Sequence, residues 1–195
     1  MPRDQWLCGL VLLACAWASP CQNLDPTAPS KEYIYIGGKL IAVELGPKLS
    51  VTVTADSVTP LSGSGSSQTF ALQYSDTFGS ADLTQAWVWI NANSTTAANS
   101  CMAYYDKASN GIYLLTDGGH FWTARSTLGA TGTLSNSQCS INLTSSSVVN
   151  SGTHLTLNLA ITFTGAYAGA KNVYMYGTNG TVSSGWQTLG TWSVP

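Results

Sequence analysis

Hydrophobic residues occupy every second position of the stretch T-H-L-T-L-N-L-A-I-T-F, which runs from residue 153 to residue 163. Successive side chains of a β-strand point to opposite faces of the sheet, so this alternation predicts a strand with one buried and one mostly polar face. A helix would spread the same large side chains around its whole circumference. We therefore predict that this strand forms the centre of a β-sandwich core, with Leu157 and Leu159 in the middle of the buried row.

Shorter segments of the same kind follow one another along the rest of the chain, separated by turns rich in glycine, serine and asparagine. No helical periodicity occurs after the first 18 residues. This pattern predicts an all-β fold: an antiparallel β-sandwich of the immunoglobulin or fibronectin type III kind, spanning residues 49–195. The expected strands are residues 50–55, 68–75, 83–91, 101–106, 112–116, 138–143, 153–163, 173–176 and 188–194.

The first 18 residues resemble a secretory signal peptide. Arg3 precedes an apolar run, and the letters A-W-A at 16–18 form a small-residue cleavage pattern. We predict cleavage after Ala18 and a secreted or cell-surface protein; a buried helix is the alternative. The letters L-L-A-C ending at Cys15 also resemble a lipobox, so a lipid anchor at Cys15 is a second form of export. No later run approaches the roughly 18 apolar residues of a membrane span, so none is expected.

Residues 19–32 contain several prolines and few hydrophobic residues, which is typical of a linker. In residues 33–48, two β-rich runs flank Gly37-Gly38, and this predicts a short β-hairpin. The letters Y-I-Y-I-G-G-K-L-I-A in this segment resemble the last repeat of Rhs/YD-repeat proteins. The resemblance implies that the hairpin is the end of a larger YD-repeat shell joined to a C-terminal domain.

A second resemblance covers about residues 51–195. It is carried by S-G-S-G-S-S-Q-T-F at 62–70, S-Q-C-S-I-N at 137–142 and G-W-Q-T-L-G-T-W-S-V-P at 185–195. These segments are similar to a β-domain found at the C-termini of large secreted acidobacterial proteins, and the last one resembles the final hairpin of immunoglobulin-like domains. The resemblance implies an extracellular immunoglobulin-like or fibronectin type III-like fold and indicates nothing about chemistry.

Export would leave Cys21, Cys101 and Cys139 in the mature chain. Thiols outside the cytosol tend to pair, and Cys101 and Cys139 both lie in strand-like segments, so we predict a disulfide between them. The loop that it closes has about 40 residues, for which chain-entropy models give roughly 3 to 4 kcal/mol. Two buried free thiols are the alternative. Cys21 has no predicted partner, and the absence of C-x-x-C or clustered histidines argues against zinc.

Charged residues make up 8% of the chain, and its formal net charge is -2. A typical soluble domain has about a quarter charged residues. The sequence therefore offers no basic surface for nucleic acid, and its solubility depends on serine, threonine, asparagine, glutamine and glycine. This composition favours a secreted structural or adhesion module.

Few side chains suggest catalysis or metal binding. Only His120 and His154 are present, and no G-x-S-x-G motif stands between a strand and a helix, so we predict neither an enzyme nor a cofactor. Asp76 and Asp82 flank one loop and could supply oxygens to calcium. Without D-x-D-x-D spacing, a turn-supporting role is favoured for both, and no metal site is predicted.

The tryptophans are the strongest candidates for a binding site. If Ala86, Val88 and Ile90 face the core, then Trp87 and Trp89 face outward about 7 Å apart along the strand. Planar rings on an open sheet suit the faces of sugars, so an alternative function is a carbohydrate-binding module that uses these two residues and Trp122. The competing interpretations are that a loop or the Tyr33 hairpin covers the rings, or that both tryptophans face the core. The expected partner is an unknown protein or glycan at the cell surface.

Overall fold

A computed structural model describes residues 31–45 and 50–195 of the chain, and within the first range the side chains of residues 34–40 only. The predicted signal peptide (1–18), the possible anchor at Cys15 and most of the predicted linker (19–32) lie outside the described residues. The chain divides into two units, Met1–Leu49 and Ser50–Pro195, and each is described by itself.

The first unit contains one antiparallel hairpin. Strands β1 (Lys31–Ile36) and β2 (Lys39–Leu45) pair around Gly37 and Gly38. Both glycines have positive φ, +59° and +80°, which is the conformation that a two-residue turn needs to match the twist of its strands. The side chains of Ile34, Tyr35 and Ile36 are all exposed.

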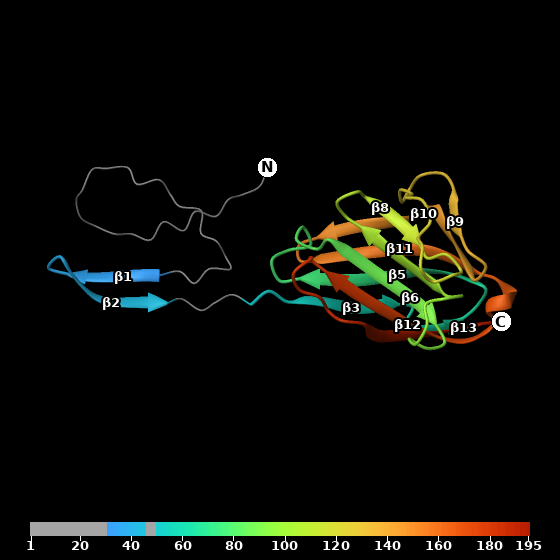
Figure 1. Cartoon of the computed structure of the whole chain (residues 1–195), viewed down its shortest axis with the longest axis horizontal. Helices are drawn as coiled ribbons and strands as arrows, with labels where there is room; N and C mark the ends of the chain where they lie inside the picture. The colour runs from blue at the N-terminus through green and yellow to red at the C-terminus, as the bar shows by residue number, and fades with distance from the viewer. Residues whose placement is uncertain (1–30, 46–49) are drawn as a thin grey trace. The chain divides into compact units, whose positions relative to one another are not determined.

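The second unit is a β-sandwich of two sheets (Figure 1). The five-stranded sheet has the order β3-β5-β11-β10-β9, and the six-stranded sheet has the order β4-β13-β12-β6-β7-β8. All neighbouring strands are antiparallel except β4 and β13, which are parallel. The first sheet comprises β3 (Val53–Thr59), β5 (Ser67–Asp76), β11 (His154–Phe163), β10 (Cys139–Ser151) and β9 (Thr133–Ser135). The second comprises β4 (Ser62–Ser64), β13 (Gln187–Val194), β12 (Gly169–Thr178), β6 (Gln85–Asn91), β7 (Cys101–Asp106) and β8 (Gly111–Leu114).

The core lies between the two sheets, and β11 supplies a continuous row to it. Burial alternates along this strand, and both Leu157 and Leu159 are fully buried, as the sequence pattern predicts. Alternate residues of β6 and β12, including Val88 and Met175, oppose them from the other sheet. The all-β sandwich expected from the alternation is therefore observed.

Two short strands and parts of three others were not expected from the sequence. β3 continues to Thr59, past its predicted end at residue 55, and β12 extends beyond the predicted 173–176 at both ends. β4 and β9 have three residues each, and β10 continues to Ser151, well past the predicted end at residue 143. The serine-rich second half of β10 stays in the sheet through a bulge between Asn142 and Ser147. There the buried Ser146 hydroxyl donates to the Asn142 carbonyl (2.6 Å) and accepts from the Ala160 N–H (3.0 Å). A serine side chain thus replaces a backbone acceptor, which hydrophobic alternation cannot reveal.

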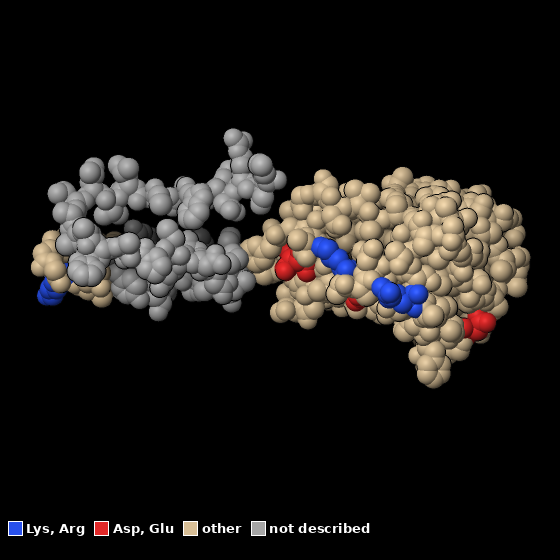
Figure 2. Space-filling view, turned by 90° about the horizontal axis from the view of Figure 1, so that it is seen from above, with Lys and Arg blue, Asp and Glu red and all other residues tan. Residues whose placement is uncertain are grey.

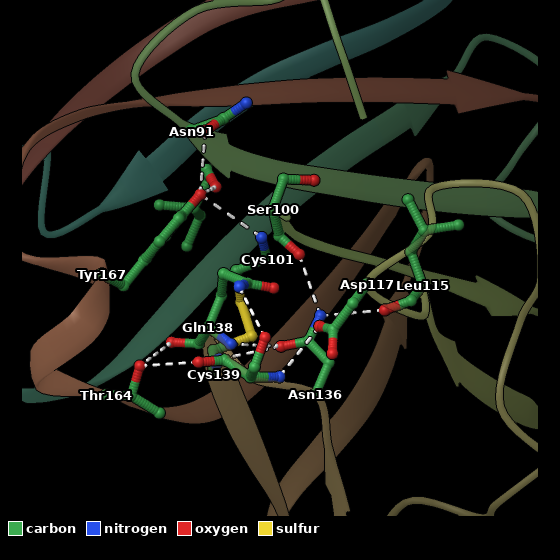
Figure 3. The surroundings of a disulfide bond; sticks show 12 residues. Asn91, Ser100, Cys101, Leu115, Asp117, Asn136, Gln138, Cys139, Thr164 and Tyr167 are labelled. Carbon is green, nitrogen blue, oxygen red and sulfur yellow. Dashed lines mark hydrogen bonds between the residues drawn. A yellow bond between two sulfur atoms is a disulfide. The ribbon is translucent and has the colours of Figure 1, made fainter. Parts of the chain in front are cut away.

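The predicted disulfide joins the two sheets. Cys101 at the start of β7 is bonded to Cys139 at the start of β10, with 5.7 Å between their Cα atoms (Figure 3). Beside it, the Asn136 amide donates to the Ser100 and Leu115 carbonyls at 2.9 Å and accepts from the N–H groups of residues 138 and 139. The amide therefore fixes the turn that leads into β10 against the six-stranded sheet.

Tyr167 closes the same end of the sandwich from a short 3-10 helix, Gly165–Tyr167 (Figure 3). Its buried hydroxyl donates to the Ile90 carbonyl at 2.6 Å and accepts from the Cys101 N–H at 3.4 Å. Burial raises the pKa of Tyr167 to about 12 against the smaller lowering effect of the Cys101 N–H. The Lys171 ammonium lies 4.5 Å from the centre of the Tyr167 ring and donates to the Ala168 carbonyl.

Candidate binding face

The outer face of the six-stranded sheet carries half of the aromatic residues of the sandwich, including four of its five tryptophans. Because Ala86, Val88 and Ile90 belong to the main core, Trp87 and Trp89 point away from it, as the outward-facing interpretation predicts. We call this surface the aromatic face. It consists of Trp87, Trp89, Met102, Tyr104, Tyr113, Leu115, Trp122, Tyr174, Tyr176 and Trp186.

Strand register places one row of rings side by side across four strands. Trp87 on β6 is paired with Tyr176 on β12 and with Tyr104 on β7, and Tyr104 is paired with Tyr113 on β8. The rings of Trp87 and Tyr104 stack at 4.5 Å with 18° between their planes, and those of Tyr104 and Tyr113 stack at 4.7 Å and 9°. The faces of the Tyr104 ring are therefore covered by stacking on Trp87 and on Tyr113.

A second row forms a small hydrophobic cluster beneath the surface. Trp89 on β6 is paired with Tyr174 on β12 and with Met102 on β7, and Leu115 completes the cluster. Only 6% of the Trp89 surface is exposed, and its indole N–H has no hydrogen-bond acceptor among the described residues. Trp89 therefore packs other rings and is not itself an open platform.

Two tryptophans from outside the strands complete the surface. The Trp122 ring lies 5.3 Å from Trp87 and 4.7 Å from Tyr104, nearly perpendicular to both. The Trp186 ring lies 6.4 Å from Trp87 and 5.8 Å from Trp89, and 41% of this residue is exposed. Trp122 and Trp186 therefore border Trp87, and among the described rings neither belongs to a stacked pair.

Several polar groups of this face have no hydrogen-bond partner among residues 50–195. They include the hydroxyls of the half-buried Tyr104, Tyr113 and Tyr176, and the indole N–H groups of Trp122 and Trp186, whereas the Trp87 N–H donates to Gln85 Oε1 at 3.1 Å. Burial, followed by the nearby Tyr113 and Asp106, raises the pKa of Tyr104 above its ordinary value. Its hydroxyl therefore keeps its proton at neutral pH and can both donate and accept.

The sequence anticipated three of these residues and missed the rest. Trp87, Trp89 and Trp122 do come together, but Trp87 and Trp89 are packed against other rings. Trp186 was missed because it lies in an irregular connection, where no periodicity indicates a direction. Tyr104 and Tyr113 alternate with core residues in their own strands, a signal that places them on an outer face without saying which strands are neighbours.

The other side chains considered for chemistry are arranged differently from an active site. His154 Nδ1 lies 3.3 Å from Asp56 Oδ2, and the Ser75 hydroxyl donates to Asp56 Oδ1 at 3.0 Å. In a hydrolase triad the histidine stands between serine and aspartate and takes the hydroxyl proton. Here the carboxylate stands in the middle, so His154 is not placed to activate Ser75. His120 is exposed in a turn.

The two aspartates considered for calcium share an amide. Asp76 is fully buried and accepts from the Phe78 N–H at 2.8 Å and from Asn179 Nδ2 at 2.9 Å, and Asp82 accepts from the same Nδ2 at 3.3 Å. The amide donor of Asn179 lies between the carboxylates, where a cation would have to bind. Among the described residues no group of three or more His, Cys, Asp or Glu side chains is placed to hold a metal ion.

Comparisons with known proteins add no relative: no model of a known protein family matches the chain, and neither does any curated protein. Within the described ranges, no helix has the length and apolar character needed to cross a membrane.

Proposed function

We propose that this chain is a secreted, non-catalytic β-sandwich module that attaches to a partner at the cell surface through its aromatic face. The observation that carries the proposal is the ring network itself. The outward face of an antiparallel sheet is usually polar, and contiguous exposed apolar surface on a single domain usually marks an interaction site. Here rings from four strands and two connections form that surface.

We also infer that the sandwich is of the immunoglobulin type, and the strand order supports this. Chain order assigns β3, β5, β11 and β10 to strands A, B, E and D of one sheet. It assigns β13, β12, β6, β7 and β8 to G, F, C, C′ and C″ of the other, the arrangement of variable-type domains. The disulfide departs from that type, because it joins C′ to D and not B to F.

Export is supported by the disulfide, since such bonds persist outside the reducing cytosol. The same proposal includes cleavage of the signal-like segment at 1–18 during export and a hairpin that forms the end of a YD-repeat shell. The proposal assigns no reaction to the chain; the Ser75, Asp56 and His154 contacts are those of a surface hydrogen-bond network.

Retention on the surface of the producing cells tests the role of the aromatic face. The full chain is compared with Trp186→Ala, with the Trp122→Ala/Trp186→Ala double variant, and with Val149→Ala as a control. Val149 is also exposed but lies on β10, in the other sheet. We expect wild type and Val149→Ala to stay on the surface and both tryptophan variants to appear in the medium. Equal retention of all four, with unchanged circular dichroism, would contradict the proposal.

A further inference from the structure

We propose that the partner of the aromatic face is an uncharged polysaccharide chain, and that Trp122 and Trp186 stack on neighbouring sugars of that chain. This inference rests on the proposed function and adds the ligand class and the contacting residues. Of the three candidates that the sequence offers, Trp122 is kept as a platform, Trp87 and Trp89 become its support, and Trp186 is added.

The first step concerns which ring faces are free. Trp87 and Tyr104 are stacked on each other, and Tyr104 is also stacked on Tyr113, so this row uses its faces internally. Trp122 stands at 83° to Trp87 and 86° to Tyr104. Trp186 stands at 84° to Trp87 and 67° to Trp89, is tilted by 37° to Tyr176, and keeps 41% of its surface exposed. Perpendicular packing fixes a ring without covering both of its faces by stacking. Both tryptophan rings are therefore held in place, and each keeps a face on which a ligand can stack.

The second step concerns the spacing of the two tryptophans. Both rings lie next to the Trp87 ring, with centroids 5.3 Å (Trp122) and 6.4 Å (Trp186) from it. Two rings that share this neighbour can contact neighbouring sugars of one polysaccharide, whereas a single small ligand would need only one ring. The contact chemistry suits sugars, because the C–H groups of a pyranose face carry partial positive charge and the face of an indole is negative.

The third step concerns the polar groups around the rings. Hydroxyls line the edges of a sugar and need both donors and acceptors. The unpartnered hydroxyls of Tyr104, Tyr113 and Tyr176 provide both, and the indole N–H groups provide donors. The two aliphatic members of the face, Met102 and Leu115, are both buried, so its accessible part consists of rings and their polar groups.

The fourth step concerns charge. No residue of the aromatic face is charged, and the carboxylate of Asp106, which follows Tyr104 by two positions, accepts from Gln85 at 3.5 Å. An anionic polymer would need lysine or arginine at its contacts. Protein interfaces are likewise enriched in tyrosine and tryptophan, but they are also enriched in arginine, which the aromatic face lacks. A neutral polysaccharide therefore fits this face better than either.

Affinity electrophoresis of the full exported chain tests the inference. The probes are soluble neutral polysaccharides (hydroxyethyl cellulose, xylan, mixed-linkage β-glucan and galactomannan) and polygalacturonate as an anionic comparison. We expect retardation by at least one neutral polymer, little change when salt is raised, and none by polygalacturonate. Trp186→Ala and Trp122→Ala should each weaken binding about 5- to 100-fold, the range found when an aromatic platform for a stacked base is removed. Val149→Ala should bind as wild type.

The outcomes separate this inference from the proposed function. If no neutral polymer binds, or if Trp186→Ala binds as tightly as wild type, the inference is wrong. If surface retention still depends on Trp122 and Trp186 but is abolished by protease treatment of the cells, the partner is a protein and only the glycan assignment fails. If retention is also independent of both tryptophans, the proposed function fails as well. Thermal melting of each variant confirms that the sandwich is folded.

Discussion

Neighbouring residues of β11 lie in environments that make their truncation cost very different amounts. Leu157 is fully buried between the sheets, whereas Asn158 is half-buried on the outer face and donates to the Ser147 hydroxyl at 3.3 Å. Leu157→Ala leaves a cavity and is expected to lower the free energy of unfolding by about 2 to 5 kcal/mol. Asn158→Ala should cost about 1 kcal/mol or less. Urea unfolding followed by tryptophan fluorescence measures both, and equal losses would contradict a two-layer sandwich.

Tyr167 makes the stability of the fold decline as the pH becomes alkaline. Burial raises its pKa to about 12 in the native state, against about 10 in an unfolded chain. Between these values the unfolded chain releases the proton and the native protein keeps it, so the stabilisation is complete below about pH 10 and is lost as the pH rises through about 12. Tyr167→Phe should lower stability at pH 7 by about 1 kcal/mol, through loss of the bond to Ile90, and should flatten the alkaline decline. Urea unfolding at pH 8, 10 and 11.5 checks this, and an unchanged slope would show that other groups cause the decline.

The side-chain amide of Asn136 makes four hydrogen bonds, which hold the turn before β10 in place. Asn136→Asp keeps the shape but removes both donors and places a carboxylate against the carbonyls of Ser100 and Leu115. We expect a loss of about 2 kcal/mol or more at pH 7, because two buried acceptors lose their partner and a charge is introduced beside them. Asn150→Asp, at an exposed position of β10, is the matched control and should have little effect. Similar melting temperatures for the two variants would contradict the role of this amide.

At the scale of elements, the disulfide ties β7 of one sheet to β10 of the other. Its half-cystines are 38 positions apart, and closing a loop of this length in the unfolded chain is worth roughly 3 to 4 kcal/mol. The Cys101→Ala/Cys139→Ala variant should lose about this much stability in urea unfolding, and reduction of wild type should have a similar effect. Alkylation of both cysteines in exported protein without prior reduction would show that the bond does not form in the cell.

The elements that the sequence predicts are those that bury hydrophobic side chains. Leu157 and Leu159 are identifiable because alternation directly reflects a buried face. β4 cannot be found in this way, since S-G-S contains no apolar residue and is a strand only because it pairs with β13. The aromatic face is partly predictable for the same reason. The outward direction of Trp87 follows from its own strand, but its contacts with Tyr104 and Tyr176 follow from strand order, which local pattern does not determine.

At the scale of the whole molecule, the sandwich has few charges and keeps its surface soluble with uncharged polar groups. Residues 50–195 contain five aspartates, two lysines and one arginine. Figure 2 shows a few charged side chains on a surface that is otherwise uncharged on the face that it draws. Interactions of such a surface depend little on salt, which is why insensitivity to salt belongs to the expected behaviour of the aromatic face.

Within the part of the chain that the structure describes, the core of the sandwich is built from residues 50–195. Every member of the main buried cluster, from Val53 to Val194, comes from that range, which is also one compact unit of the chain. A chain that begins at Ser50 should therefore fold with the same melting temperature, within about 1 °C, as a chain that begins at Ser19. For a domain of this size, 1 kcal/mol corresponds to about 2 to 4 °C, so calorimetry resolves a contribution well below the loss of one core side chain. A midpoint lower by 4 °C or more in the shortened chain would show that residues before Ser50 stabilise the sandwich, and its core would then be larger than the cluster between the two sheets.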